Sequence, residues 1–507
     1  MMRNKKVICA LIFLALVVCA GCSAKFLGES KKLATQKEDR RLNFVLIVTD
    51  DQRTDTLWAM ENLRKKLVAR GIEFKEGFVT TPLCCPSRAS ILTGLYSHNT
   101  GILANKPPYG GAPSFKDSGK DKLTLAVWLQ NKGYKTALIG KYMNEYYRIS
   151  PYIPPGWNKW IAFTKPTVNP PSGKGYTDFS VNIDGKEIEN PSDYSTDFLF
   201  EESLKFINDD NNRPFFLYLT PFAPHDPATP AEQDKHMFRD FHHRPPSYNE
   251  KDISDKNNPM VQNRESFTGK RQWDLDKFTR NQLRSLQAVD RGIRSIIDEL
   301  IKKDLLKNTV IIFTSDNGYL WGEHRLDRKA SPYEEAIRVP FIIYVPDIPG
   351  GRIDKENLVL NIDIAPTILE LAGIEKPQDF EFDGKSLVPI LKNTTARLRD
   401  EFWIEFIGQK TQFLVKQTFY GVRTSKFKLI EYLTGEKEFY DLREDPLELD
   451  NQYENPGYQE IIAELDKKLE ILKEEVMQIL IEEGSKPEET AEKEEGEKDE
   501  KEADDNE

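Results

Sequence analysis

Cys84 is the residue whose type and surroundings most suggest chemistry, because it opens the stretch Cys84-Cys85-Pro86-Ser87-Arg88 and has no evident disulfide partner. The chain contains five cysteines, and only Cys84 and Cys85 lie beyond residue 22. Neighbouring cysteines pair poorly, because a disulfide needs α-carbons further apart than one trans peptide allows. An unpaired cysteine is therefore either buried and inert or present for its chemistry.

The residues that follow Cys84 predict a turn that leads into a helix, with Pro86 in the first turn and Gly94 at the close. Free N–H groups at a helix start favour negative charge, and Arg88 follows one turn later, so we expect a lowered pKa for the Cys84 thiol. Such a thiolate could serve as a nucleophile. However, the sequence pairs no histidine with Cys84 as a general base.

Oxygen ligands form a second candidate group. Asp50 and Asp51 follow one apolar segment, and Asp316 and Asn317 follow another. An all-oxygen set with no accompanying His or Cys cluster suits Ca²⁺ or Mg²⁺ rather than zinc. The Asp50-Asp51 pair alone could also be a helix N-cap. The second acidic segment end favours a cation site.

Four short apolar segments must position these residues, because each ends at polar side chains. The segments are residues 43–49, 134–139, 215–220 and 310–314, which lead to Asp50, Lys141, His225 and Asp316. Helical patterns at 123–132 and 276–303 lie between them, and this alternation is typical of a parallel α/β sheet. Ligands of such sheets bind outside the carboxyl ends of the strands. The polar residues are therefore expected to converge on one site.

Two regions differ from this alternation. Residues 145–200 and 226–272 are rich in Pro, Gly, Asn and Asp and are predicted to be long loops over the strand ends. Beyond about residue 395, strand patterns at 401–406, 420–423, 427–432 and 438–441 precede an amphipathic helix at 458–481. This predicts a small antiparallel sheet with a helix across it, and a subdomain boundary near Lys392 and Asn393.

The first residues predict export. Basic residues precede an apolar run at 7–19, which is too short for a comfortable membrane span and is typical of a secretory leader. Ala20-Gly21-Cys22 resembles the lipobox of bacterial lipoproteins, which implies a lipid anchor at Cys22 and a membrane-anchored lipoprotein at the periplasmic or cell surface. Simple secretion and a retained anchor are the alternatives. Residues 1–22 are thus the expected signal peptide, and residues 23–42 a tether.

The formal net charge of −11 is concentrated at the C-terminus, because residues 484–507 carry twelve acidic and four basic residues and leave only −3 for residues 1–483. We predict a disordered acidic tail at 484–507, with an acidic docking arm as the alternative. The expected domains are a catalytic domain at 43–392 and a C-terminal subdomain at 393–483. No nucleic acid partner is expected.

The stretch Cys84-x-Pro86-Ser87-Arg88-x-x-x-Leu92-Thr93-Gly94 resembles the signature of the type I sulfatases. The resemblance extends from about Asn43 into the C-terminal subdomain, through motifs in the same order: Thr49-Asp50-Asp51-Gln52, Gly140-Lys141-Tyr142, Ala223-Pro224-His225, Ser315-Asp316-Asn317-Gly318, Gly322-Glu323-His324, Lys329, Tyr333-Glu334-Glu335 and Arg338-Val339-Pro340. It implies an alkaline-phosphatase-like α/β fold, with a mostly parallel sheet flanked by helices and a smaller C-terminal antiparallel sheet with a helix.

The resemblance also implies a mechanism. A formylglycine-generating maturation enzyme would oxidise Cys84 to Cα-formylglycine, whose hydrate supplies the nucleophile. One Ca²⁺ would be held by the modified Cys84 together with Asp50, Asp51, Asp316 and Asn317. Arg88 would hold the formylglycine side, while the sulfate would be surrounded by Lys141, His225 and Lys329. His225 or Lys329 would protonate the leaving alcohol and Asp316 would accept the proton of the attacking hydroxyl, with His324 as a possible further substrate contact.

One motif departs from the family pattern, because many sulfatases carry Lys-x-His where this chain has Lys141-Tyr142-Met143. A methionine cannot accept a proton, so the base for sulfate release stays open. The string Gly140-Lys141-Tyr142-Met143-Asn144-Glu145-Tyr146 is similar to that of N-acetylglucosamine-6-sulfatases and extracellular heparan 6-O-endosulfatases. This similarity implies a sulfated carbohydrate substrate, either a glycosaminoglycan or another glycan.

Two other interpretations stay open. The protein could be a phosphodiesterase or phosphonate monoester hydrolase of the same superfamily, or an inactive glycan-binding surface lipoprotein, although the intact set of site residues argues against the second. Outside the motifs, three tryptophans could stack on sugar rings or pack internally: Trp157, Trp160 and Trp273. Basic loop residues could meet an anionic sugar chain or be solvated loop charge, namely His236, Arg239, His242, His243 and Arg244.

Overall fold

A ten-stranded sheet forms the centre of the protein in the computed structural model, which describes residues 41–164, 175–209, 213–262, 264–410, 413–414 and 417–482. In spatial order its strands are β13 (Arg352–Asp354), β2 (Ile72–Phe74), β12 (Phe341–Tyr344), β9 (Thr309–Ser315), β1 (Asn43–Thr49), β8 (Phe215–Thr220), β4 (Lys135–Gly140), β5 (Lys159–Phe163), β6 (Ser180–Ile183) and β7 (Lys186–Glu189). The expected signal peptide, lipid anchor, most of the tether and the acidic tail lie outside the described residues.

The five central strands β9, β1, β8, β4 and β5 run parallel to one another, whereas β12 beside β9 and β6 beside β5 are antiparallel. Strand β1 pairs with β9 through Val45 and Ile311 and with β8 through Val45 and Leu217, so its backbone is bonded on both sides. All seven residues of β1 are buried, as the continuous apolar run predicts. The predicted parallel α/β sheet is confirmed.

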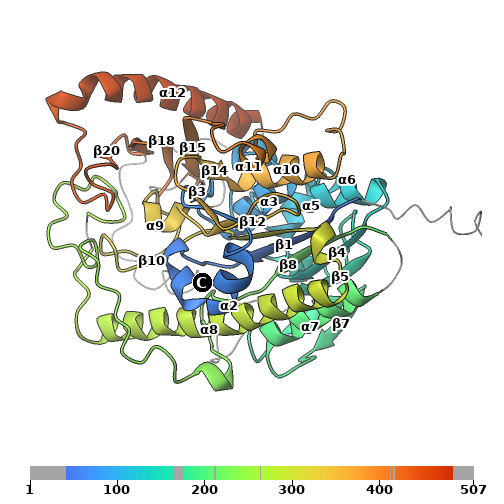
Figure 1. The fold of residues 1–507 in the computed structure, drawn as a ribbon. Coiled ribbons are helices and arrows are strands. Elements are labelled where there is room, and N and C mark those ends of the chain that lie inside the picture. The colour runs from blue at the N-terminus through green and yellow to red at the C-terminus, as the bar shows by residue number, and fades with distance from the viewer. Residues whose placement is uncertain are drawn as a thin grey trace, which may run out of the picture. The chain divides into compact units, whose positions relative to one another are not determined.

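Helices cover both faces of this sheet (Figure 1). Alternate residues of β1 point to opposite faces, so Leu46 packs in one core cluster and Ile47 in another. The first cluster includes residues of α3 (Cys84–Thr93), α6 (Leu125–Asn131) and α10 (Ile364–Leu371). The second includes residues of α7 (Ser195–Asn208) and α8 (Gly269–Lys302). The strand ends therefore stand between two rigid helical layers.

The predicted loop at 145–200 is wrong in part, because it contains β5, β6, β7 and α7. Its composition obscured the short strands, and every residue of β7 is exposed, which removes the usual alternation of apolar and polar residues. The charged sequence of β7 suits an outer strand, since charged side chains protect a sheet edge from further pairing. The predicted loop at 226–272 contains no strand within its described residues, but its last residues, from Gly269, belong to α8.

Helix α8 begins at Gly269, about two turns before the predicted start. Its first turns lie largely in solvent, so they lack the apolar periodicity on which the prediction depended. Thr268 adopts an extended conformation and marks the N-terminus. This additional segment contributes to the surroundings of the candidate site described below.

The C-terminal part forms the predicted antiparallel sheet, in the order β15 (Glu401–Phe406), β18 (Phe419–Thr424), β19 (Phe427–Tyr432) and β20 (Lys437–Asp441). Helix α12 (Gln459–Glu482) lies across it (Figure 1). Leu465 and Leu469 of the helix pack with Val422 and Leu429 of the sheet. Helix α11 (Val388–Lys392) ends before this sheet begins, and the boundary near Asn393 stays a prediction.

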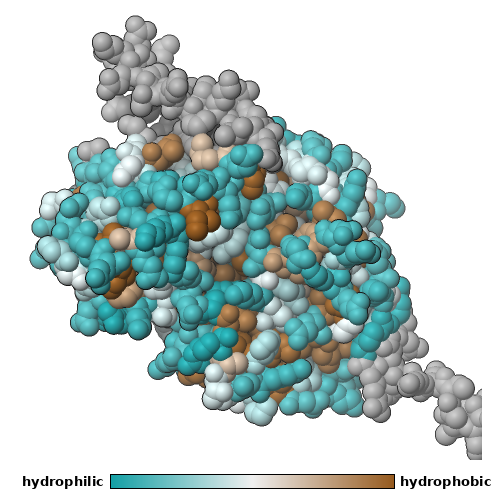
Figure 2. Space-filling view, turned by 90° about the horizontal axis from the view of Figure 1, so that it is seen from above, coloured by the Kyte–Doolittle hydropathy of each residue, from teal (hydrophilic) through white to brown (hydrophobic). Residues whose placement is uncertain are grey.

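The face seen in Figure 2 is largely hydrophilic, with small separate groups of hydrophobic residues. Among the described residues, no helix combines the length and apolar character needed to cross a membrane.

Candidate active site

The polar residues after four neighbouring strands meet at one edge of the sheet, as predicted. Asp50 follows β1, Lys141 follows β4 and His225 lies five residues after β8. Lys141 Nζ lies 2.5 Å from Asp50 Oδ2, and His225 Nε2 lies 3.6 Å from Asp51 Oδ2. The amide of Asn317, two residues after β9, donates to Asp51 Oδ1 at 2.7 Å. The parallel order of the strands therefore assembles the site from distant segments.

Cys84 is the first residue of α3 and places its sulfur in this cluster. The preceding residue Leu83 is extended, and Gly94 ends the helix in the left-handed conformation with a φ of 76°. Cys84 Sγ lies 3.5 Å from Asp50 Oδ1 and 2.8 Å from Lys329 Nζ. The helix thus starts at the carboxylates, and the thiol is fully buried.

The expected lowering of the Cys84 pKa is wrong. Burial raises the pKa of this thiol well above its usual value, and this outweighs the opposing effect of Lys141 and Lys329. The helix start and Arg88 were the basis of the prediction, but a thiol with no access to water has no solvent to stabilise its charge. The geometry therefore favours a protonated thiol rather than a ready thiolate nucleophile.

The neighbouring Cys85 has a different environment. Its side chain is fully buried in the apolar cluster that contains α6 and α10, and its backbone N–H donates to Asn105 Oδ1 at 3.0 Å. Burial raises the pKa of Cys85 to about 12. Within the described residues, only Cys84 of the two adjacent cysteines contacts the acidic cluster.

Arg88, one turn after Cys84, fixes the helix to the cluster. Its guanidinium is fully buried, and its Nε donates to Asp316 Oδ2 at 2.8 Å. A second nitrogen donates to the backbone carbonyl of Lys141 at 2.8 Å. Although burial opposes its charge, Asp316 and Asp50 raise the pKa of Arg88, so it stays cationic. Arg88 therefore orients acidic groups and is shielded from solvent.

The charges of the cluster compensate one another. Burial raises the pKa of Asp50, but Lys141, His225 and Arg88 together hold it well below its usual value. Burial and the adjacent Asp50 raise the pKa of Asp316. Although burial opposes the charge on Lys329, Asp51 holds its pKa well above the usual value, with Nζ 2.6 Å from Asp51 Oδ1. The site can thus hold several like charges because each has an opposite partner.

The proposed cation ligands are close together and buried. Ligand atoms of Asp50, Asp51, Cys84 and His225 lie within 4.8 Å of one another, so His225 joins a group that the sequence assigned to oxygen ligands alone. Asn317 Oδ1 is buried and has no hydrogen-bond partner within the described part of the chain. Asp51 has a φ of 65°, and its N–H donates to Asp316 Oδ1 at 3.1 Å. Such hard oxygen atoms, with one buried carbonyl oxygen still to be satisfied, fit Ca²⁺.

His324 and Met143 have other surroundings. His324 is fully buried, with Nδ1 2.7 Å from Glu250 Oε2 and its ring stacked on Tyr333 at 4.1 Å. Within the described residues His324 does not contact the acidic cluster, so substrate contact by His324 stays a prediction. Met143 packs in the apolar core beside α3, and its side chain is 3% exposed.

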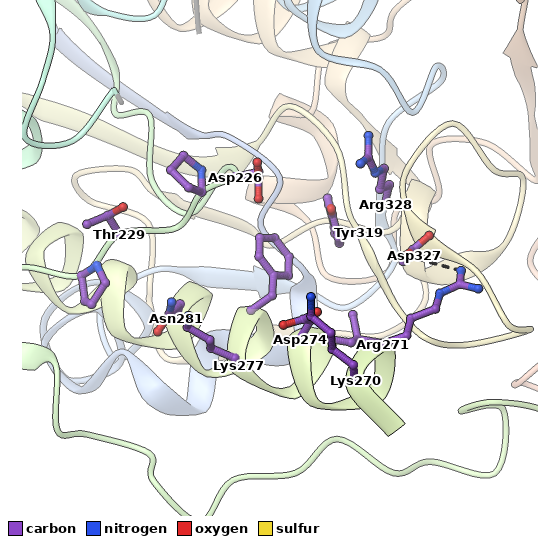
Figure 3. A pocket seen from close by; sticks show the side chains of 14 residues that line it. Asp226, Thr229, Lys270, Arg271, Asp274, Lys277, Asn281, Tyr319, Asp327 and Arg328 are labelled. Atoms are coloured by element: carbon purple, nitrogen blue, oxygen red, sulfur yellow. Dashed lines mark ion pairs between the residues drawn. The ribbon is translucent and has the colours of Figure 1, made fainter. Parts of the chain in front are cut away.

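A cavity of about 840 Å³ adjoins the cluster (Figure 3). Asp226 and Arg328, which line it, are the chain neighbours of His225 and Lys329, and Tyr319 lies two residues beyond Asn317. The first turns of α8 form another side of the cavity. This side of the cavity was not predicted from the sequence, because the predicted helix began only at residue 276. The charged residues of α8 spaced three and four apart were the signal that could have shown it.

The sulfatase family model matches residues 42–374, and a model described as N-sulphoglucosamine sulphohydrolase, C-terminal, matches residues 322–475. The chain therefore belongs to the sulfatase family. It is 39% identical over 372 residues to a putative extracellular sulfatase Sulf-1 homolog of Caenorhabditis elegans, with 70% of this chain and 49% of that protein covered. It is 32% identical over 418 residues to the N-acetylglucosamine-6-sulfatase of Homo sapiens, with 78% and 71% covered.

Solved structures agree with the fold. One protein, bound to its substrate D-glucosamine-2-N,6-O-disulfate, matches with a TM-score of 0.71 and 26% identity, covering 86% of this chain and 98% of that one. The phosphonate monoester hydrolase of Silicibacter pomeroyi matches with a TM-score of 0.69 and 20% identity, covering 86% and 95%, which shows the fold alone. The alkaline-phosphatase-like fold is confirmed. The chain spans about half the length of the Caenorhabditis elegans relative and 34% of the Drosophila melanogaster one.

Proposed function

We propose that this protein hydrolyses sulfate esters of a sulfated carbohydrate. The observation that carries the proposal is the position of Cys84 Sγ at the start of α3, in contact with Asp50 and Lys329 at the ends of the parallel strands. Membership of the sulfatase family supports the reaction class. The relatives named N-acetylglucosamine-6-sulfatase and the solved complex with a sulfated glucosamine support an amino-sugar sulfate as substrate.

Cys84 is proposed to act as Cα-formylglycine rather than as a thiol. The raised pKa of the Cys84 thiol disfavours the thiolate, so oxidation to an aldehyde gives the position a function that the buried thiol lacks. The full burial of Cys84 also means that a maturation enzyme could not reach it in the folded protein. We therefore expect modification before α3 packs against the sheet. Cys85 is the unmodified neighbour.

Asp50, Asp51, Asp316, Asn317 and the modified residue 84 would hold one Ca²⁺. When bound, this ion would neutralise charge on the sulfate oxygens and favour the ionised nucleophile. Loss of activity on chelation and its return on addition of Ca²⁺ are the expected results. Full activity after exhaustive chelation would contradict the calcium proposal.

The other steps of the reaction are assigned to Lys329, Lys141 and His225. Lys329 Nζ lies between Asp51 and Cys84 Sγ and so stands at the nucleophile, where its charge stabilises an anion. Lys141 holds Asp50 and lies near the same centre. His225 Nδ1 lies 2.8 Å from the carbonyl oxygen of Asp226, which can only accept, so Nδ1 carries the proton and Nε2 faces the cluster. We propose that His225 acts in its doubly protonated form, in which Nε2 also carries a proton and donates it to the leaving alcohol.

Asp316 is proposed to accept the proton of the attacking hydroxyl, as the family resemblance implies. The base for sulfate release must differ from that of many sulfatases, because Met143 is a core residue. The groups nearest to Cys84 Sγ are Asp50, Asp51 and Lys329. Lys329 is held in its protonated form, so one of the two carboxylates, Asp50 or Asp51, would take the proton that a histidine takes elsewhere.

An exported location is proposed from the leader at residues 1–22, and a lipid anchor at Cys22 would place the enzyme at a membrane surface. Two relatives are named extracellular sulfatases, which supports export. Intact mass of the mature N-terminus tests the anchor, since a mature protein without lipid at residue 22 would contradict it.

A comparison of substrates tests the reaction class. Kinetics on a sulfate ester and a phosphate ester of the same alcohol should show a clear preference for the sulfate ester, and the opposite preference would support a phosphodiesterase instead. Cys84→Ala should abolish turnover, whereas Cys85→Ala, a matched change in the core, should retain it. Binding of sulfated glycans without any turnover by fully modified protein would support the inactive glycan-binding alternative.

A further inference from the structure

Helix α8 presents a row of positive side chains beside the candidate active site. Lys270, Lys277, Arg280 and Arg284 fall within one face of the helix, because successive residues turn by about 100°. We call these four residues the cationic track. It covers about 21 Å along the helix, at 1.5 Å per residue. The chain as a whole is acidic, with a net charge of −11, so this local excess of positive charge departs from its surroundings.

One end of the track enters the cavity beside the catalytic cluster (Figure 3). Lys270 and Lys277 line this cavity from α8, and Arg328 lines it from β11 (Asp327–Arg328). Arg271 is paired with Asp327 across the cavity at 3.8 Å. Lys270 and Lys277 are exposed, and neither forms an ion pair within the described residues, so both ammonium groups remain accessible to a ligand.

The other end of the track continues away from the cavity. Burial, followed by the like charges of Arg280 and Arg239, lowers the pKa of Arg284. Backbone carbonyls hold two of these arginines, since Arg284 Nε donates to Met237 O at 2.7 Å and Arg280 donates to Phe241 O at 3.4 Å. The positive charge is thus fixed in place rather than neutralised by carboxylates.

An aromatic surface lies on the same helical face. Trp273 is 57% exposed, and Lys277 Nζ lies 5.4 Å from its ring centre. The two other tryptophans considered for sugar stacking pack inward, because Trp160 is 1% exposed and Trp157 stacks on Phe216. An exposed indole beside ammonium groups can stack on a sugar ring while the cations meet its anionic substituents.

We propose that the cavity and the cationic track bind the sugar units beyond the one that carries the scissile sulfate. The sulfate or carboxylate groups of those units would contact Lys270 and Lys277, and their hydroxyl groups could donate to Asp274 and Asp226. The preferred substrate is thus an oligosaccharide with several anionic groups rather than an isolated monosaccharide sulfate. This inference rests on the proposed function, because it specifies the substrate of the same site.

Binding of a heparin hexasaccharide to the full mature protein tests the track by calorimetry. Lys270→Gln combined with Lys277→Gln should weaken binding about tenfold, since each exposed ion pair contributes up to about 1 kcal/mol. The matched control is Lys302→Gln with Lys307→Gln near the far end of α8, which removes the same charge and should weaken binding less than about twofold. Equal weakening by both pairs, or no weakening by the first pair, would overturn the proposal.

Turnover separates this inference from the proposed function. The ratio of kcat/KM for release of sulfate from the hexasaccharide to that for 4-nitrophenyl sulfate should fall about tenfold in the track variant. The small ester has no further sugar units, so its hydrolysis by the protein without substitutions tests the sulfatase activity alone. A protein that hydrolyses the small ester but binds the hexasaccharide no better than a fully desulfated one would retain the proposed function and refute the track.

Discussion

Cys84 and His225 lie in the same small cluster, with ligand atoms within 4.8 Å of each other, but different groups hold them. Cys84 Sγ contacts Asp50 and Lys329, whereas His225 reaches Asp51 with Nε2 and holds its other nitrogen against the carbonyl of Asp226. The His225 side chain is partly exposed, whereas Cys84 is fully buried. The two side chains are thus close enough to act on one sulfate ester, and the different groups that hold them suit different steps.

The leaving group tests the role of His225. His225→Ala should reduce kcat/KM on a sugar sulfate about 10²–10⁴-fold, because a sugar alkoxide is a poor leaving group and needs a proton. The same variant should lose much less activity on 4-nitrophenyl sulfate, whose phenolate leaves without protonation. Steady-state kinetics on both esters provide the measurement. Equal losses on the two substrates would contradict a proton donor and indicate a role in binding or charge balance.

At the level of elements, the close approach of two strands positions Lys141. Gly140 ends β4 with a φ of 127°, and an added Cβ would lie 2.0 Å from the backbone oxygen of Thr220 at the end of β8. The glycine thus lets β4 turn beside β8 so that the next residue reaches Asp50. Backbone space at a strand end therefore determines where Lys141 lies.

Gly140→Ala should therefore lower both stability and activity. The clash with backbone and the unfavourable φ together should cost at least about 1–3 kcal/mol, with a larger relative loss of kcat because Lys141 moves. Gly373→Ala is a matched control, because it has a φ of 67° but no atom within 4 Å of the added Cβ. Thermal unfolding and kinetics measure both effects. Equal losses of stability and kcat in the two variants would contradict the argument from close approach.

Across the whole molecule, buried acidic groups connect the catalytic part with the C-terminal sheet. Glu334 contacts Lys428 of β19 at 3.1 Å, and the backbone N–H of Glu334 donates to Glu448 at 2.8 Å. The next residue, Glu335, is partly buried, with Oε2 3.9 Å from His324 Nε2. Burial, followed by the charge of Glu323, raises the pKa of Glu335 from 4.5 to about 7, and Glu448 also contributes. A titratable group therefore lies beside the contact between the two parts of the chain.

The pH dependence of stability tests this contact. The folded state favours protonated Glu335, so its stabilising contribution is present below pH 4.5 and is lost as the pH rises through about 7. Glu335→Gln should therefore become more stable relative to the wild type as the pH rises, by on the order of 1–3 kcal/mol. Glu370→Gln, at an exposed position, is the control. Denaturant unfolding at pH 5 and pH 8 with the same difference for Glu335→Gln would contradict this account.

Some parts of the molecule could be predicted from the sequence, and others could not. The run Asn43–Thr49 predicted a central strand correctly, because burial on both faces leaves a continuous apolar pattern. Strand β7 was missed because an exposed, charged edge strand has no such pattern. Asp50, Lys141 and Asp316 each follow a strand of a parallel sheet, and this pattern predicted correctly that they converge. The Cys84 pKa could not be predicted, because it depends on burial by residues that are distant in the sequence.

The chemical state of residue 84 tests the central claim most directly. Mass spectrometry of the peptide spanning Cys84 and Cys85 should be made on protein whose sulfatase activity has been measured in the same preparation. We predict a loss of about 18 Da at residue 84, as expected for conversion of a thiol side chain to an aldehyde, with residue 85 unchanged. Activity that rises with the modified fraction would support the account. Fully active protein with an unmodified thiol at Cys84 would contradict it.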